Sequence, residues 1–152
     1  MNSTVEYIAL GISIVSLFCS LGTYICTVLH DRKQGTLDSF NTLQREAFDN
    51  LNRISPAEIR DIVAHPKQRS DEYNTICGYV ARIEHFCVGV NMRIYDKKTV
   101  YWLAHGYLDG LKLLSRIEPV IDKKNRFDET DYYENIHKVL KWMNEENKRS
   151  MY

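Results

Sequence analysis

The most informative feature of the hydrophobic pattern is an uninterrupted apolar stretch near the N-terminus. Residues 7–29 contain no charged side chain, whereas nearly every charge in the chain lies after His30. A helix of about 20 apolar residues crosses the ~30 Å hydrocarbon core of a bilayer. Residues 1–6 hold no Lys or Arg, which argues against a cleaved secretory signal. We therefore expect an N-terminal tail and a single transmembrane helix within residues 1–30, and a separate domain in residues 31–152.

The basic residues that flank the apolar stretch indicate its orientation. Arg32 and Lys33 follow the stretch closely, and no basic residue precedes it. Basic residues next to a membrane helix favour the cytoplasmic side. The flanks therefore predict a single-pass protein of the cell inner membrane, with the N-terminus outside and the C-terminal domain in the cytoplasm.

Small residues recur within the apolar stretch at alternating steps of four and three. The members of this small-residue seam are Ala9, Ser13, Ser16, Ser20, Thr23 and Thr27. Small residues let membrane helices approach closely, and hydroxyl groups can bond across the contact. The seam therefore predicts a homo-oligomer held by the transmembrane helix. Two alternatives stay open: the hydroxyls bond to their own backbone, or several copies assemble so that the seam lines a narrow pore.

Beyond the apolar stretch, apolar positions recur at the helical spacing of three and four residues. A first helix is expected over residues 36–54; it either continues directly from the transmembrane helix or is joined to it by a hinge at Gly35. A second, short helix should begin at the cap residue Ser55, with Pro56 in the first helical position. It should end by His65, because the proline that follows disfavours helical geometry in the residue before it.

Three further helices are predicted in the second half of the chain. The third, over residues 71–92, carries the most regular apolar stripe and should be the central helix. The fourth should start after the cap Asp96 and end or kink at Pro119, and the fifth should start near residue 129 or 130. No run of alternating polarity predicts a strand. The expected fold class is therefore all-α, with one transmembrane helix and a small cytoplasmic bundle of about five helices.

Glycines within the third and fourth predicted helices indicate close packing. A glycine inside a helix costs about 1 kcal/mol relative to alanine, so a neighbouring element that needs the space is the usual reason for one. We therefore expect close neighbours at Gly78, Gly89, Gly106 and Gly110.

Composition excludes several classes of function. The 20 Lys and Arg residues balance the 20 Asp and Glu residues, so no general attraction to nucleic acid is expected. The four cysteines form no CxxC motif and are interpreted as reduced, apolar side chains. There is no P-loop and no GxGxxG motif. We expect no cofactor and no nucleic-acid partner.

One pair of residues resembles a catalytic signature. The segment from Arg60 to His65, with four intervening residues, resembles the signature of the HEPN ribonucleases. In that family the histidine and arginine would act on the RNA phosphate and its 2′-hydroxyl. This spacing also arises by chance, and the segment lies in a short helix that a proline ends. A structural role is therefore favoured over catalysis.

Glu84 on the central helix is the other catalytic candidate, as a general base if burial raised its pKa. A paired structural carboxylate is favoured, with Arg126 or Arg116 as the partner. A metal site built from His85, His105 and His137 is not expected, because no two histidines lie three or four residues apart.

Several short motifs resemble an uncharacterised bacterial family, domain of unknown function 4760. The resemblance extends from Tyr73 to Trp142 and includes the basic segment that follows the apolar stretch. The motifs are Arg32-Lys33-Gln34-Gly35-Thr36-Leu37, Ile83-Glu84-His85-Phe86 with Gly89, Ile94-Tyr95-Asp96, Pro119-Val120-Ile121 followed by Arg126, Tyr133, and Leu140-Lys141-Trp142. The pair His85-Phe86 departs from the small or aliphatic residues expected there. The family has no settled activity, so the resemblance implies fold and topology and transfers no site residues.

The leading functional interpretation is a membrane-anchored, self-associating and non-enzymatic protein. Its cytoplasmic bundle would bind or sense an unidentified cytoplasmic protein, and its other partners would be the lipid bilayer and its own copies. One alternative is a membrane-disrupting or pore-forming effector of a bacterial defence system, an analogy at the level of architecture only. A second alternative is a membrane-tethered, HEPN-like ribonuclease.

Overall fold

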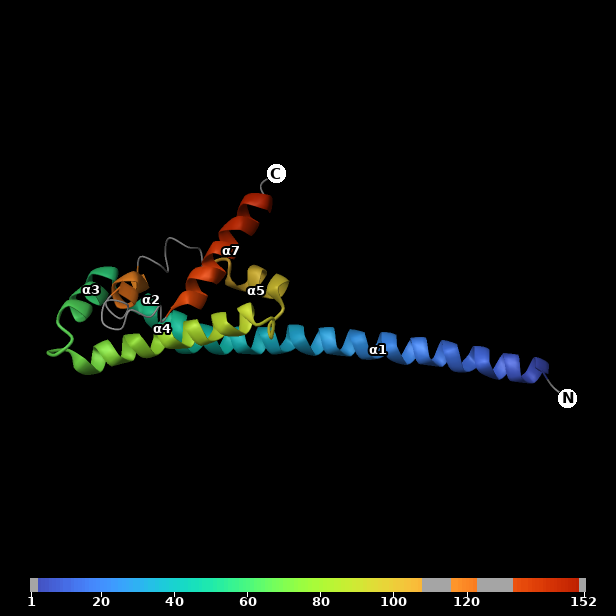
Figure 1. Ribbon diagram of the computed structural model, residues 1–152. Helices are drawn as coiled ribbons and strands as arrows, with labels where there is room; N and C mark the ends of the chain where they lie inside the picture. Colours follow the sequence, from blue (N-terminus) through green and yellow to red (C-terminus); the bar gives the residue numbers. More distant parts are fainter. Residues whose placement is uncertain (1–2, 108–115, 123–132, 151–152) are drawn as a thin grey trace.

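The computed structural model describes residues 3–107, 116–122 and 133–150, and the fold is all-α, as predicted (Figure 1). The helices are α1 (Ser3–Leu43), α2 (Asp49–Arg53), α3 (Pro56–Ala64), α4 (Ser70–Asn91), α5 (Lys97–Ala104) and α7 (Glu134–Ser150). A π-helical turn, η1 (Gln44–Phe48), joins α1 to α2, and residues 116–122 are also helical. No strand occurs in these ranges.

The first helix is much longer than either helix predicted in its region. It runs through Gly35 without interruption, so the direct continuation is confirmed and the alternative of a hinge at this residue is wrong. A Cβ added at Gly35 would meet no atom of the described residues within 4 Å. The glycine costs the helix about 1 kcal/mol, which is too little to interrupt it when the segments on both sides strongly favour helical structure. The expected division between residues 30 and 31 therefore falls inside one continuous helix.

The two halves of α1 have different surroundings. Residues 7–30 are all exposed, and Figure 1 shows this half projecting from the rest of the protein as a bare rod. This projecting half is long and apolar enough to cross a membrane. The second half enters the domain, where Thr36, Phe40 and Leu43 are buried.

The buried face of the domain matches the predicted apolar stripes closely. From the first predicted helix, Phe40, Leu43, Ala47 and Leu51 are buried, and the π-helical turn adds Phe48. The stripe of α4 is buried at Ile76, Val80, Ile83, Cys87 and Val90, which confirms α4 as the central helix. It lies between α1 and α7 and contacts both of them.

The cap residues confirm two predicted helix starts. The Ser55 hydroxyl accepts a hydrogen bond from the backbone N–H of Glu58 at 3.2 Å. The Asp96 carboxylate accepts one from the N–H of Thr99 at 2.9 Å and a second from the Thr99 hydroxyl at 2.7 Å. The bonds from the Glu58 and Thr99 backbone satisfy N–H groups that a helix leaves free in its first turn.

The fourth predicted helix differs from the observed structure. Here α5 ends at Ala104 and residues 105–107 form a turn, so a single helix reaching Pro119 is wrong. Residues 116–122 are helical through Pro119, which therefore does not end that segment. The fifth helix, α7, is described from Glu134, and its predicted start near residue 129 or 130 lies outside the described residues.

The glycine predictions have a mixed outcome. A Cβ added at Gly89 would lie 2.4 Å from a ring carbon of Tyr95, which confirms close packing there. At Gly78 and Gly106 an added Cβ would meet no atom of the described residues within 4 Å, so the close packing predicted there is wrong for this part of the chain. Gly110 lies outside the described residues.

Candidate functional site

The part of α1 that follows the apolar stretch is hydrogen-bonded to the loop between α4 and α5. The Arg32 guanidinium donates hydrogen bonds to the backbone carbonyls of Arg93 and Tyr95, the latter at 2.9 Å. The Thr36 hydroxyl donates to the Arg32 carbonyl at 2.7 Å and accepts from the Asp96 N–H at 2.8 Å. We call these contacts the α1 latch. They fix the α4–α5 loop to the helix that leaves the domain.

The charge of Asp96 is stabilised mainly by Thr99, with a smaller contribution from the latch residue Arg32. The pKa of Asp96 is lowered, first by the hydrogen bond from the Thr99 side chain and also by the positive charges of Lys33 and Arg32. The carboxylate therefore stays ionised while it caps α5. The sequence indicated Arg32 as a topology signal and as part of a family motif, but nothing in it placed Thr36 opposite Asp96.

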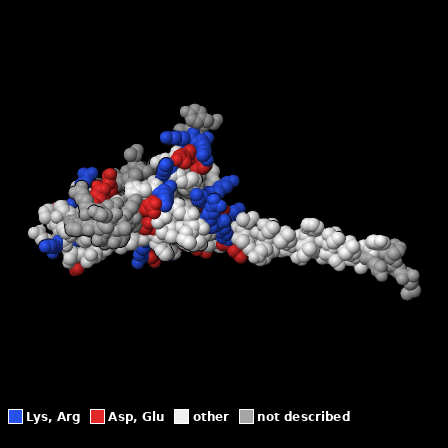
Figure 2. Space-filling view, viewed as in Figure 1, with Lys and Arg blue, Asp and Glu red and all other residues white. Residues whose placement is uncertain are grey.

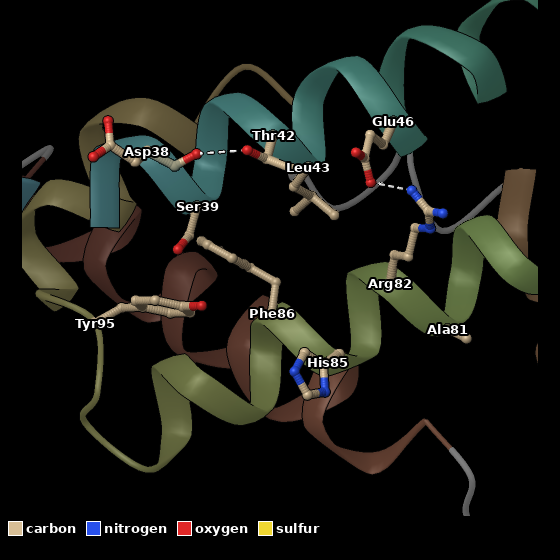
Figure 3. Close-up of a pocket in the computed structure, with 10 residues that line it drawn as sticks. All are labelled: Asp38, Ser39, Thr42, Leu43, Glu46, Ala81, Arg82, His85, Phe86 and Tyr95. Atoms are coloured by element: carbon tan, nitrogen blue, oxygen red, sulfur yellow. Dashed lines mark hydrogen bonds and ion pairs between the residues drawn. The ribbon is translucent and has the colours of Figure 1, made fainter. Parts of the chain in front are cut away.

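Beside the latch, α1 and α4 form an open groove with a volume of about 560 Å³. In Figure 3, the Phe86 ring of α4 extends toward Ser39 of α1, Leu43 of α1 projects into the same groove, and Tyr95 lies at one end. Its remaining lining residues are Asp38, Ser39, Thr42, Glu46, Ala81, Arg82 and His85. The groove thus has an aromatic and aliphatic floor with polar residues around its rim.

An ion pair closes the other end of the groove. Arg82 of α4 pairs with Glu46 of the π-helical turn, and both side chains are about half exposed (Figure 3). Such exposed pairs contribute at most ~1 kcal/mol to stability, so the pair can open at little cost. His85 at the rim is exposed, and no hydrogen bond joins it to a hydroxyl among the lining residues described. The arrangement suits binding better than nucleophilic catalysis, which requires a base hydrogen-bonded to its nucleophile.

Glu84 lies on α4, and its carboxylate has a structural role at the start of α7. Its carboxylate accepts from the N–H groups of Asn135 and Ile136 at 3.2 and 2.9 Å, and from the Asn135 side-chain amide at 2.7 Å. A carboxylate is favourable where free N–H groups and the positive end of the helix dipole meet. Glu84 therefore ties α4 to α7, a role that sequence reasoning missed because the two residues it joins are about fifty positions away.

The predicted ion pair of Glu84 with Arg126 concerns a residue outside the described ranges. Arg116, the other candidate, donates to the backbone carbonyls of Leu51 and Ile54, both at 3.0 Å. Its guanidinium thus satisfies carbonyls at the end of α2.

The two residues of the HEPN-like segment do not come together. Arg60 is exposed, and His65 lies at the end of α3, where its Nδ1 is 3.2 Å from a carboxylate oxygen of Asp61. Among the described residues, no hydrogen bond or ion pair joins Arg60 to His65. Asp61 also pairs with Arg69 at 2.9 Å.

The histidines considered for a metal site are dispersed. His105 lies on α5's terminal turn, with its Nε2 2.9 Å from the Asn147 side-chain oxygen, whereas His85 lies at the groove. Within the described residues, no group of three or more His, Cys, Asp or Glu side chains could hold a metal ion.

Some hydroxyls of the small-residue seam bond to the backbone of their own helix, which was one of the alternatives to self-association. Those of Ser13, Thr23 and Thr27 donate to backbone carbonyls four residues earlier, at 2.9–3.0 Å. Ser16 and Ser20 make no such bond among the residues described. These two hydroxyls are therefore the seam's free donors for a contact between helices.

Cys87 and Tyr133 are buried and Tyr73 is partly buried, and this burial favours the neutral form of all three side chains. Burial raises the pKa of Cys87, and the neighbouring Glu84 adds to the shift. Burial also raises the pKa of Tyr73 and of Tyr133 to about 12 each. All four cysteines are free, and Cys87, with its raised pKa, is a poor nucleophile.

Comparison with known proteins identifies no relative. No protein-family model matches the chain, and no curated protein or solved structure matches it either. The resemblance to domain of unknown function 4760 therefore stays a prediction from its short motifs.

Proposed function

We propose that this is a single-pass, non-enzymatic membrane protein whose domain binds or senses a cytoplasmic protein. In this proposal α1 crosses the inner membrane with its N-terminus outside, and the protein self-associates through the seam. The orientation is supported by Arg32 and Lys33, which lie only on the domain side of the apolar stretch.

The observation that carries this proposal is the continuity of α1. A helix of 41 residues is ~60 Å long, about twice what a bilayer core requires. Its second half supplies Asp38, Thr42 and Leu43 to one wall of the groove. A rotation or shift of the membrane half is therefore transmitted, without a joint, to the helix that forms one wall of the groove. This geometry suits a module that couples helix association in the membrane to partner binding in the cytoplasm.

The groove supports a protein segment as the partner. Its floor at Phe86 and Leu43 suits an apolar side chain, and Asp38 and Glu46 on the rim favour a basic neighbour. Short peptide segments are commonly bound in this way, with apolar anchors in a groove and polar contacts around it. The π-helical turn at one end of the groove is a local irregularity of a kind often found at functional sites.

Self-association is tested by the mass of the detergent-solubilised full-length protein. Replacing Ser16 and Ser20 by Leu fills the seam and removes its two free hydroxyls, so the protein should change from a defined oligomer to a monomer. The matched control replaces Val15 and Cys19 by Leu, which adds bulk at the same spacing on another face of α1. An oligomer that survives in the seam variant, or dissociates equally in the control, contradicts assembly through the seam.

A further inference from the structure

Exposed hydrophobic side chains gather in one segment of the domain. Outside the apolar stretch of α1, the large hydrophobic residues exposed in the described part of the chain are Met92, Ile94 and Trp102. Their exposed fractions are 68%, 59% and 71%. Single exposed hydrophobic residues are common on soluble proteins, but here all of them fall within residues 92–102, on the α4–α5 loop and α5.

The α1 latch places this segment next to the point where the apolar stretch ends. Arg32 bonds to the carbonyls of Arg93 and Tyr95, the residues on either side of Ile94. Arg32 lies three residues after Leu29, a rise of ~4.5 Å along the helix. Figure 1 shows α5 and the preceding loop beside α1 where it leaves the domain. Residues 93–95 of the segment are therefore held close to the predicted hydrocarbon boundary.

The charges around the segment are mainly basic. Figure 2 shows Lys and Arg side chains gathered where the uncharged half of α1 meets the domain. Lys33, Arg93 and Lys98 are exposed, and Lys97 is half-buried over the Trp142 ring at 5.0 Å. Two acidic residues lie close by: Asp31 is exposed, and Asp96 caps α5.

We propose that residues 92–102 form a second membrane contact, in which Met92, Ile94 and Trp102 enter the headgroup region of an anionic bilayer. Tryptophan favours this region because its ring is amphipathic, and short apolar side chains beside basic ones are typical of interfacial membrane binding. Lys33, Arg93 and Lys98 then face the anionic headgroups. This inference rests on the proposed membrane crossing by α1.

The second contact would determine how the domain sits on the membrane. With α1 as the single contact, the helix and its domain can turn and tilt together in the bilayer, whereas a second contact fixes their orientation. The groove between α1 and α4 would then face the cytoplasm at a defined angle.

The two tryptophans of the chain allow a direct test. Trp142→Phe leaves Trp102 as the fluorophore, and Trp102→Phe leaves the half-buried Trp142 as the matched control. Each full-length variant is reconstituted into phosphatidylcholine vesicles that contain phosphatidylglycerol, with and without brominated acyl chains. We expect Trp102 to emit at a shorter wavelength than a tryptophan exposed to water, and its emission to be quenched by the brominated chains. The emission of Trp142 should not be quenched by them.

Other outcomes separate this inference from the membrane crossing. If the protein floats with the vesicles and resists alkaline extraction but Trp102 is not quenched, α1 crosses the membrane and the second contact is wrong. If the Trp102 emission shifts without quenching, a second copy of the protein covers it, which also overturns the lipid contact. If the protein neither floats nor resists extraction, the membrane crossing fails and the inference fails with it.

The anionic preference is tested by charge reversal. Arg93→Glu with Lys98→Glu should reduce the quenching of Trp102 in these vesicles, because each basic residue near an anionic surface changes such an equilibrium by about fivefold. The control pair, Lys141→Glu with Lys148→Glu on α7, makes the same change in net charge and should leave the quenching unchanged. Equal quenching in all the variants would overturn the role of the anionic headgroups.

Discussion

Arg32 and Thr36 lie one helical turn apart on α1, at the point where its bare half enters the domain. Arg32 uses its guanidinium to satisfy two loop carbonyls, and Thr36 uses one hydroxyl both to donate and to accept. Thr36 is completely buried. A buried polar group that loses its partner costs the full desolvation of that group, so the latch should depend strongly on this hydroxyl.

We therefore predict that Thr36→Val destabilises the full-length protein by about 1–3 kcal/mol, because the Asp96 N–H is left without its acceptor. The control is Thr42→Val. The Thr42 hydroxyl donates to the carbonyl four residues earlier at 3.0 Å, as Thr36 does, but Thr42 is exposed. Denaturant unfolding in detergent measures both variants. A loss of similar size in the two would contradict the latch.

The sequence predicted helices correctly wherever the signal for a helix lies within a few residues of it. The caps at Ser55 and Asp96 and the apolar stripe of α4 lie within a few residues of the positions they determine, and all three are confirmed. The contacts that join elements were not predictable in this way. The contact of Glu84 with the start of α7 and that of Thr36 with Asp96 join segments that packing brings together. No local spacing in the sequence encodes such contacts.

The glycines of α4 show the same limit within a single helix. Gly78 and Gly89 look equivalent in the sequence, yet only Gly89 lies against another element, the ring of Tyr95. Tyr95 also stacks on Phe86, with their ring centroids 4.9 Å apart, so its ring has little room to move. The sequence shows a glycine, but not which neighbour it faces.

Paired alanine substitutions should separate the two glycines. Gly89→Ala forces Cβ into the Tyr95 ring and should destabilise the protein by about 1–3 kcal/mol. Gly78→Ala meets open space and should stabilise it by about 0.5–1 kcal/mol. Thermal unfolding of the full-length variants measures the sign of each change in stability. A stabilising effect of Gly89→Ala would show that the Tyr95 ring does not lie against Gly89.

At the scale of the whole molecule, the protein is a small domain built onto the second half of a long helix. The first half of α1 is apolar and uncovered, and the second half supplies both the core and one wall of the groove. The sequence predicted an apolar half and an amphipathic half, and it left open whether they continue directly or meet at a hinge at Gly35; the structure shows one continuous helix. Their continuity is the feature that makes a mechanical link between membrane and groove reasonable, since a flexible joint would not transmit rotation.

The most direct test of this account is hydrogen–deuterium exchange of the full-length protein in lipid nanodiscs, read along α1. We predict that the backbone N–H groups of residues 7–29 are protected by the helix and the lipid, and that protection continues without a gap through residues 30–43. Gly35→Ala should leave this profile unchanged. Fast exchange confined to the residues around Gly35 would reveal a hinge, and it would contradict the proposed coupling between the membrane helix and the groove.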